Sequence, residues 1–418
     1  MGLRDELMKI AVKIRDVVAL VRRFEEAPLD AMGELVSEIQ AAAAKTVEHL
    51  MDVEIDLFLN QPAEEENKRN GFTTRTFNFK GIGALRLRVP RDRKGNFESK
   101  IVPPGRRYDA ALEKDLALLH LSGISTRMLS YVSGRVLGLK VSPQEVSNAL
   151  ATVVPAAKKF LERRLEDRRF MYLYIDGTFF SVQRTTVEKE PTLVVLGVDE
   201  SGHKSVVAAV QGDKDSKTAW AMVFNQLKER GLAKDAVKAG IMDGLPGLEQ
   251  AFFEAFPKAV ALRCWVHKAR NVFPLVPRRY QAEFKSSWDA VACASSRKAA
   301  EVSLAALELR WKAVCGDAVA NLLKDKEALL GHYDFPPEHW KALRTTNPIE
   351  RVNKELKRRS KAMETIGSDG LKALVAFTAL RMEYGWAMAP ITSPKLRNLE
   401  AHNELHGKLD RITKELLR

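Results

Sequence analysis

The sequence has few cysteines and no long apolar segment. Cys264, Cys293 and Cys315 are the only cysteines in 418 residues. Three are too few for a disulfide framework, so they favour a reducing compartment. No run of about 18 apolar residues is present, and the chain does not begin with a charged region followed by an apolar one. We therefore expect a cytoplasmic protein with neither a membrane span nor a secretion signal.

Acidic residues are also scarce relative to basic ones. The chain has 67 Lys and Arg against 54 Asp and Glu, a formal net charge of +13. This surplus favours a polyanion such as nucleic acid as the partner, although a basic protein without such a partner remains an alternative. With 45% hydrophobic and 29% charged residues, the composition is that of a globular protein with two to four domains.

The N-terminal part of the sequence changes its periodicity once. Up to about residue 60, apolar residues recur at helical spacing, as in Leu35, Ile39 and Ala43. From Phe72 to Val89 they alternate with polar residues on either side of a glycine turn, which is typical of a hairpin. We predict a helical region over 1–65, which is a candidate dimer interface, and a small β region over 66–110.

Two short helices are predicted between residues 123 and 150. Ser125 or Thr126 fits the cap of the first, and Ser142 with Pro143 fits the start of the second. Two helices around a glycine-containing turn favour a helix-turn-helix in a DNA-binding region over 111–168, while an ordinary helical hairpin remains the alternative. The candidate DNA contacts here are Arg127 and Gln144.

From Phe170 onward, short apolar runs alternate with helical patterns. Residues 171–176, 192–199 and 204–211 are predicted as strands, followed by a helix, a strand over 237–243, a second helix and a strand over 259–266. This order is that of the ribonuclease H-like fold, in which three antiparallel strands are extended by parallel ones.

The sequence patterns also delimit the remaining regions. We predict an α/β ribonuclease H-like catalytic core over 169–272 and 344–390. An all-α insertion over 273–343, where strand signals are lacking, interrupts it, and a C-terminal helical tail covers 391–418.

Two Asp-Gly pairs fall at predicted strand ends. Alone, Asp176-Gly177 and Asp243-Gly244 would each be read as a plain turn. At matching ends of one sheet they instead favour metal ligands, with the glycine letting the chain turn away. Carboxylates suit Mg²⁺ or Mn²⁺, and two such ions about 4 Å apart activate one oxygen and stabilise another in phosphodiester displacement.

A third acid lies in a strongly basic segment. In residues 344–361, Asn347 fits a helix cap, Pro348 the first helical position and Glu350 the third. Glu350 is a candidate metal ligand, or else it completes a capping box while the basic run is a solvated face. The candidate DNA contacts of this part of the chain are His267, Lys268, Arg270, Arg344, Arg351, Lys354, Lys357, Arg358 and Lys361.

Four ordered blocks carry a family resemblance. YIDGTFF around Asp176, IMDGLPGLEQAF around Asp243, RCWVHKARNV over 263–272 and TTNPIERVNKELKRRS over 345–360 resemble the motifs of bacterial Mutator-like transposases of insertion sequences. Further upstream, RNGF (69–72), LRVPRDRKGNFE (87–98) and GISTRMLS (123–130) resemble the N-terminal half of that family. The resemblance implies a DDE triad, carried over as Asp176, Asp243 and Glu350.

Cys264 and His267 form a C-x-x-H pair within the third block. Zinc needs about four ligands with paired spacing, and no second pair is nearby. The resemblance makes the pair characteristic, so we expect active-site support or a DNA contact, with a structural histidine as the alternative. Asp199 and Asp213 are expected to be structural, and Trp288 to lie in a helical core rather than to stack on a base.

The resulting hypothesis is a DNA transposase. It would bind the terminal inverted repeats of its element and perform metal-dependent cleavage and strand transfer as a homodimer or larger assembly on double-stranded DNA. We expect two Mg²⁺ ions, no small-molecule cofactor, no membrane partner and association with the bacterial nucleoid. An excised circular intermediate is suggested by the resemblance alone. The alternatives are a DNA-binding regulator without catalysis and a nuclease or resolvase without strand transfer.

Overall fold

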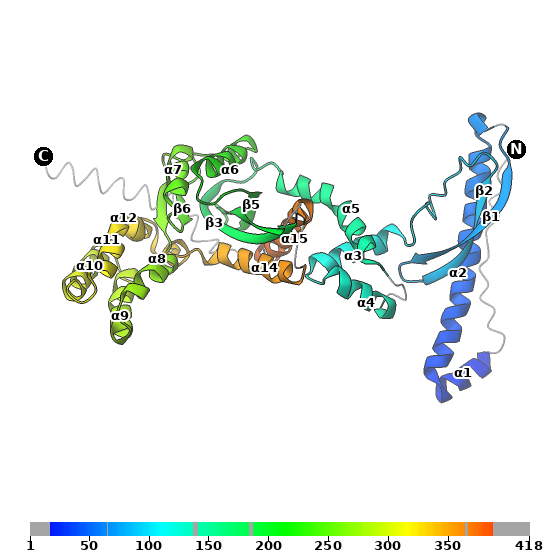
Figure 1. Ribbon diagram of the computed structural model, residues 1–418, viewed down its shortest axis with the longest axis horizontal. Helices are drawn as coiled ribbons and strands as arrows, with labels where there is room; N and C mark the ends of the chain where they lie inside the picture. Colours follow the sequence, from blue (N-terminus) through cyan, green and yellow to red (C-terminus); the bar gives the residue numbers. More distant parts are fainter. Residues whose placement is uncertain (1–16, 65, 137–140, 184–186, 364–366, 388–418) are drawn as a thin grey trace. The chain divides into compact units, whose positions relative to one another are not determined.

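The computed structural model describes residues 17–64, 66–136, 141–183, 187–363 and 367–387 of the chain. It is a mixed α/β structure with more helix than strand (Figure 1), and it forms two compact units, Met1–Val153 and Val154–Arg418. No helix within the described ranges has the length and apolar character to cross a membrane. Residues 1–16 and the predicted tail over 391–418 lie outside the described residues.

The first unit begins with two helices and a hairpin. After α1 (Val17–Glu26), Pro28 starts the long helix α2 (Pro28–Leu59), and a short 3₁₀ turn at Pro62–Glu64 leads into β1 (Arg69–Phe79) and β2 (Gly83–Asp92). The strands pair antiparallel, and the turn between them uses glycines with positive φ, 81° at Gly81 and 98° at Gly83. The predicted helices and hairpin are confirmed, including the alternating burial along β2.

The helices α3 (Ala110–Leu121) and α4 (Thr126–Val136) follow in this unit, and α5 (Pro143–Leu161) begins in it and continues past Val153 into the second unit. Ser125 caps α4 by accepting from the Met128 amide, which decides between the two predicted caps. Ser142 and Glu145 form a reciprocal capping box at the start of α5. Both predicted helices are therefore present, while their use as a DNA reader stays a prediction.

The second unit is built on one five-stranded sheet of order β5-β4-β3-β6-β7. The strands are β3 (Phe170–Gln183), β4 (Val187–Asp199), β5 (Lys204–Gln211), β6 (Ala239–Met242) and β7 (Val260–Arg263). The first three pair antiparallel, and β6 and β7 continue the sheet parallel to β3. The predicted strand order and directions are thus confirmed.

Helices cover both faces of this sheet (Figure 1). On one face, α6 (Lys217–Glu229) and α7 (Pro246–Ala255) bury Trp220, Phe224 and Phe252 against Leu173 and Ile175 of β3. On the other lie α14 (Asn347–Met363) and α15 (Ser368–Ala387). Because side chains alternate along a strand, Tyr174 points to this second side and donates to the Ala342 carbonyl over 3.1 Å. Asp176, two residues on, points the same way.

Between β7 and α14 the described chain is helical. α8 (Trp265–Val272) is followed by α9 (Gln281–Ala292), α10 (Arg297–Trp311), α11 (Gly316–Lys324), α12 (Lys326–Leu330) and α13 (Trp340–Leu343), joined in part by 3₁₀ turns at 273–275, 278–280, 331–334 and 337–339. Trp288 and Trp311 lie in their common core, so Trp288 is a core residue as expected. The absence of strands predicted for this segment is confirmed.

Three local predictions were wrong. β3 does not end at Asp176 but continues to Gln183, because β4 pairs with it residue by residue, with Gly177 opposite Leu193. β7 ends at Arg263, and Cys264 is already the cap of α8. Thr346, not Asn347, precedes the first turn of α14, since its carbonyl accepts from the amides of Ile349 and Glu350 at 3.0 Å each.

Candidate active site

The three acids lie on three neighbouring elements. Asp176 lies within β3, Asp243 follows the last residue of β6, and Glu350 lies in the first turns of α14. β6 is the direct parallel neighbour of β3, and α14 packs on β3. His267, in the first turn of α8, links the set, since it is close enough to both Asp176 and Glu350 for their negative charges to raise its pKa.

Asp176 is largely buried and is held by α14. Its Oδ2 accepts from Asn353 Nδ2 over 2.7 Å. Burial, and then the negative charge of Asp243, raise the pKa of Asp176 to about 6, although His267, Asn353 and a backbone amide pull it downward. A carboxylate that is destabilised in this way gains from a nearby positive charge, and a metal ion is one source of it.

Asp243 sits on a turn that only glycine permits. Gly244 has φ of 92°, and a Cβ there would fall 0.4 Å from Nη1 of Arg263. Arg263 is itself buried and bonded to Glu249 at 3.0 Å and Asp325 at 3.1 Å. The prediction that a glycine lets the chain turn after the acid therefore holds at Asp243, and it is wrong at Asp176. Oδ1 of Asp243 is buried without a hydrogen-bond partner among the described residues.

Glu350 faces cations rather than the end of its own helix. Its Oε1 lies 3.3 Å from His267 Nε2 and 3.5 Å from Arg270 Nη1, and it is a second buried carboxylate oxygen without a hydrogen bond in the described chain. Among the described residues, no hydrogen bond joins the Glu350 side chain to Asn347. The capping-box alternative is thus not formed, as expected once Thr346 takes the cap position.

Cys264, His267 and Thr346 form a small hydrogen-bonded group beside Glu350. The Thr346 amide and hydroxyl reach Cys264 Sγ at 3.3 and 3.2 Å, and the hydroxyl lies 3.3 Å from His267 Nδ1. Burial raises the pKa of the Cys264 thiol, but hydrogen bonds from His267 and Thr346 outweigh it and leave that pKa lowered. The hydrogen bond with Cys264 is the largest cause of the raised pKa of His267. The group orients the imidazole toward Glu350.

The side chains predicted to contact DNA differ in their exposure to solvent. Arg127 and Gln144 are exposed on α4 and α5, and Arg270 is exposed beside Glu350. On α14 the exposed cations are Arg351, Lys354, Lys357, Arg358 and Lys361. They form a basic face that lies opposite the buried stripe of Ile349, Val352 and Leu356.

Two of the predicted contacts have structural roles instead. Lys268 is only 5% exposed, and its ammonium group lies 2.6 Å from Asp325 Oδ2, so it has no free face for a phosphate. Arg344 is half-buried and donates to the Ala292 carbonyl over 2.8 Å. Asp199 is also structural, as expected, because it accepts from the amides of Ser201 and His203.

The sequence reasoning missed Asn353, Arg263 and Thr346. Asn353 holds Asp176, Arg263 lies under the Asp243 turn, and Thr346 connects Cys264 with His267. One signal was available: Asn353 is three residues after Glu350, so both lie on the same side of a helix. Thr346 is one of three adjacent residues that suit a helix cap, and no sequence pattern pointed to a role for Arg263.

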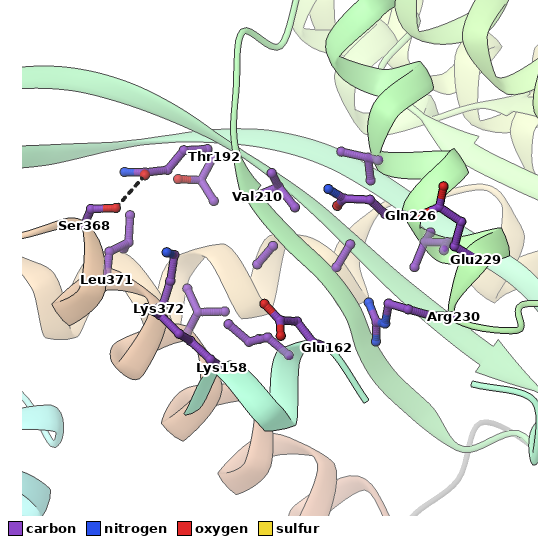
Figure 2. Close-up of a pocket in the computed structure, with 17 residues that line it drawn as sticks. Lys158, Glu162, Thr192, Val210, Gln226, Glu229, Arg230, Ser368, Leu371 and Lys372 are labelled. Atoms are coloured by element: carbon purple, nitrogen blue, oxygen red, sulfur yellow. Dashed lines mark hydrogen bonds between the residues drawn. The ribbon is translucent and has the colours of Figure 1, made fainter. Parts of the chain in front are cut away.

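A cavity of about 530 Å³ lies apart from the three acids. Figure 2 shows its lining, which comes mainly from α5, β4, β5, α6 and α15 and includes Lys158, Val210, Arg230 and Leu371. Ser368 closes one end with a hydrogen bond to Gln211. None of the predicted site residues lines this cavity, so the chemistry of the acids has to be judged without it.

Comparison with known proteins gives one consistent result. The model of the family described as "Transposase, Mutator family" matches residues 18–387. The transposase for insertion sequence element IS905 of Lactococcus lactis is 31% identical over 318 residues, which cover 75% of this chain and 80% of that protein. The transposase for IS406 of Burkholderia multivorans is 27% identical over 392 residues, 91% of this chain and 97% of that protein.

Proposed function

This chain belongs to the Mutator family of transposases, and from that premise we propose that it binds the terminal inverted repeats of an insertion sequence and cuts and joins DNA with Asp176, Asp243 and Glu350. The single observation that carries the proposal is that Asp176 on β3, Asp243 after β6 and Glu350 on α14 lie on neighbouring elements, beside an exposed basic helix face. We further propose that the sheet and its helices form a ribonuclease H-like core. The order β5-β4-β3-β6-β7 with its strand directions supports this.

The three carboxylates are of the ligand type that hard divalent cations prefer. Mg²⁺ prefers carboxylate oxygens, and buried oxygens of Asp243 and Glu350 lack hydrogen bonds in the described chain. Within the described residues, no group of three or more His, Cys, Asp or Glu side chains is arranged so that it could hold a metal ion by itself. Waters and DNA phosphates commonly complete a Mg²⁺ site, so an open arrangement is compatible with it. When bound, two such ions supply an activated oxygen and stabilise the leaving oxygen.

The chain's own residues would prepare that reaction. The Asn353 amide orients the carboxylate of Asp176, and the turn at Gly244, resting on Arg263, fixes Asp243. Arg270 places positive charge 3.5 Å from Glu350, and His267 lies 3.3 Å from the same carboxylate oxygen. Exposed cations of α14 would grip the phosphates that flank the reacting bond, and their charges would make binding depend on salt.

A joining assay separates this function from its alternatives. The full-length protein is given an element end with a pre-cut 3′-hydroxyl and a target plasmid, with Mg²⁺, Ca²⁺ or EDTA. We expect joining with Mg²⁺ and little with Ca²⁺, whose coordination is larger and looser. Cleavage without joining would indicate a nuclease, and specific binding without either would indicate a regulator. Full activity in EDTA would exclude the carboxylate site.

A further inference from the structure

The long helix α2 has a second apolar face that the hairpin does not cover. Its first face packs on β1 and β2 through residues such as Met51, Ala44 and Val47, and Figure 1 shows the hairpin running along one side of the helix. Further contacts flank that face: Glu48 bonds to Arg88, and Asp52 and Asp56 bond to Arg69. Most of the remaining surface of α2 lies outside these contacts.

On this surface of α2, apolar residues recur at alternating spacings of three and four residues. We call them the α2 stripe: Leu29, Met32, Val36, Ile39, Ala43, Thr46, Leu50, Val53 and Leu57. This is an unbroken a/d heptad pattern over four heptads, about 42 Å of helix. No position of the stripe carries a charge, and the hydroxyl of Thr46, the one polar member, is satisfied by the Ala42 carbonyl at 3.0 Å.

The stripe is exposed in the described chain. Its seven large apolar side chains are between 37% (Val53) and 87% (Leu29) exposed. The helix α1 contacts α2 but leaves these side chains exposed. Contiguous exposed apolar surface of this extent marks an interaction site. Since the stripe has no cation, DNA phosphates are not its partner.

We propose that the α2 stripe is a dimer interface that pairs with the same stripe of a second copy of this chain in a two-helix coiled coil. A strict a/d seam is self-complementary, because the knobs of one helix fit the holes of an identical one, and a two-fold axis then closes the assembly. The hairpin borders the stripe along one side, since Ala43 packs against the hairpin core, and the large apolar side chains of the stripe remain outside that core.

The small residues at the centre of the stripe support close pairing. Ala43 and Thr46 lie midway between the bulkier groups at Met32–Ile39 and Leu50–Leu57. Two stripes can therefore approach at their middle while the larger side chains interdigitate on both sides. This inference gives a location to the dimerisation expected for residues 1–65, and it is independent of the three acids.

The test is the mass of the full-length protein in solution at high salt, where DNA does not bridge copies. Light scattering should give about twice the 46.8 kDa of one chain for the wild type. Ile39→Lys with Leu50→Lys should weaken the dimer by at least about 100-fold, because unpaired ammonium groups would enter the apolar seam. Ser37→Lys with Ala41→Lys is the matched control, since both positions are exposed on α2 outside the stripe.

The outcomes are distinct. A two-chain mass for wild type and control, with a one-chain mass and unchanged circular dichroism for the stripe variant, supports the interface. A one-chain wild type at tens of micromolar overturns it, as it would if another segment of the same chain covered the stripe. A stripe variant that remains a dimer overturns it as well. Loss of strand transfer in a variant of the three acids leaves all these masses unchanged, so the two proposals fail separately.

As a second measurement, Ile39→Cys with Leu50→Cys is made in a Cys293→Ser background, because Cys293 is the exposed native thiol. With both positions present, either helix orientation brings thiols of two chains together. Mild oxidation should then give a covalent dimer, and Ser37→Cys with Ala41→Cys should give none. Equal cross-linking of both variants would contradict the interface.

Discussion

The helices α2 and α14 each bury one apolar face and expose another face of a different kind. α14 buries Ile349, Val352 and Leu356 and exposes a row of Lys and Arg, whereas α2 exposes the α2 stripe. Burial within the chain accounts for one face of each helix. For the other face we propose a partner outside the chain, a polyanion for the cations of α14 and an identical apolar seam for the α2 stripe. The comparison separates residues that act inside one chain from those that need another molecule.

The largest effect is expected at Glu350, on the inner side of α14. Glu350→Gln keeps the shape but removes the charge, and a neutral amide coordinates Mg²⁺ poorly. Cleavage and strand transfer should fall by several orders of magnitude, while the free energy of unfolding changes by less than about 0.5 kcal/mol. Glu350→Asp should also fail, because the shorter side chain withdraws the carboxylate.

Gel assays of joining and urea unfolding check this prediction. Element-end binding and the two-chain mass serve as controls, and both should stay as in the wild type. Near-normal strand transfer by Glu350→Gln would show that the inner side of α14 does not perform the chemistry.

Asn353 should have the next largest effect. Asn353→Ala removes the amide that donates to Asp176, and the loss of such an outer partner typically costs about 10–100-fold in metal affinity or activity. We expect an apparent Mn²⁺ affinity lowered within this range with the melting temperature little changed. Asn353→Asp should be worse, since a second carboxylate would face Asp176. If Asn353→Ala shifts only stability, the contact is structural.

Substitutions in the first unit should have a smaller effect on DNA binding, and that effect should depend on the DNA sequence. Arg127→Ala or Gln144→Ala should weaken binding to the element end by about 10-fold, the cost of one base contact, and leave binding to random DNA unchanged. Competition binding with the full-length protein measures both. Equal losses on both DNAs would make these residues phosphate contacts and remove the helix-turn-helix interpretation.

The smallest effect belongs to the basic face of α14. Each of Lys354→Ala, Lys357→Ala and Lys361→Ala should reduce the slope of log K against log salt by roughly one unit, on any DNA sequence. The Ser37→Lys with Ala41→Lys variant of α2 is the control. It should change the slope of log K against log salt by less than about half a unit. Unchanged slopes for the α14 variants would make that face an ordinary solvated one.

Local patterns predicted much of the fold. The short apolar run in 204–211, the helical period after Ser216 and the cap at Ser142 each act within a few residues, and each element was found where expected. The Asp-Gly pair at Asp176 misled because a turn is its commonest local meaning. Pairing with β4, a tertiary effect, keeps the strand extended there.

The site was less predictable for the same reason. The three acids and His267 were identified from motifs, but their supports come from distant parts of the chain. Asn353 reaches Asp176 across 177 residues, and Lys268 is neutralised by Asp325 across 57. From the sequence alone, a lysine in a basic segment is expected to be exposed. Its burial is recognised only when the acidic partner from a distant part of the chain is known. In the segment Thr345-Thr346-Asn347, three adjacent residues suit a cap, and only the backbone geometry selects Thr346.

The most direct test of the central claim is Mn²⁺ binding to the full-length protein on an element end, followed by electron paramagnetic resonance. The wild type should bind two ions per active site. Asp176→Asn and Asp243→Asn should each lose ions or bind them at least about 10-fold more weakly. Asp213→Asn, at an exposed acid outside the site, should bind as the wild type does. Unchanged Mn²⁺ binding by Asp176→Asn and Asp243→Asn would contradict the assignment of these carboxylates as the metal site.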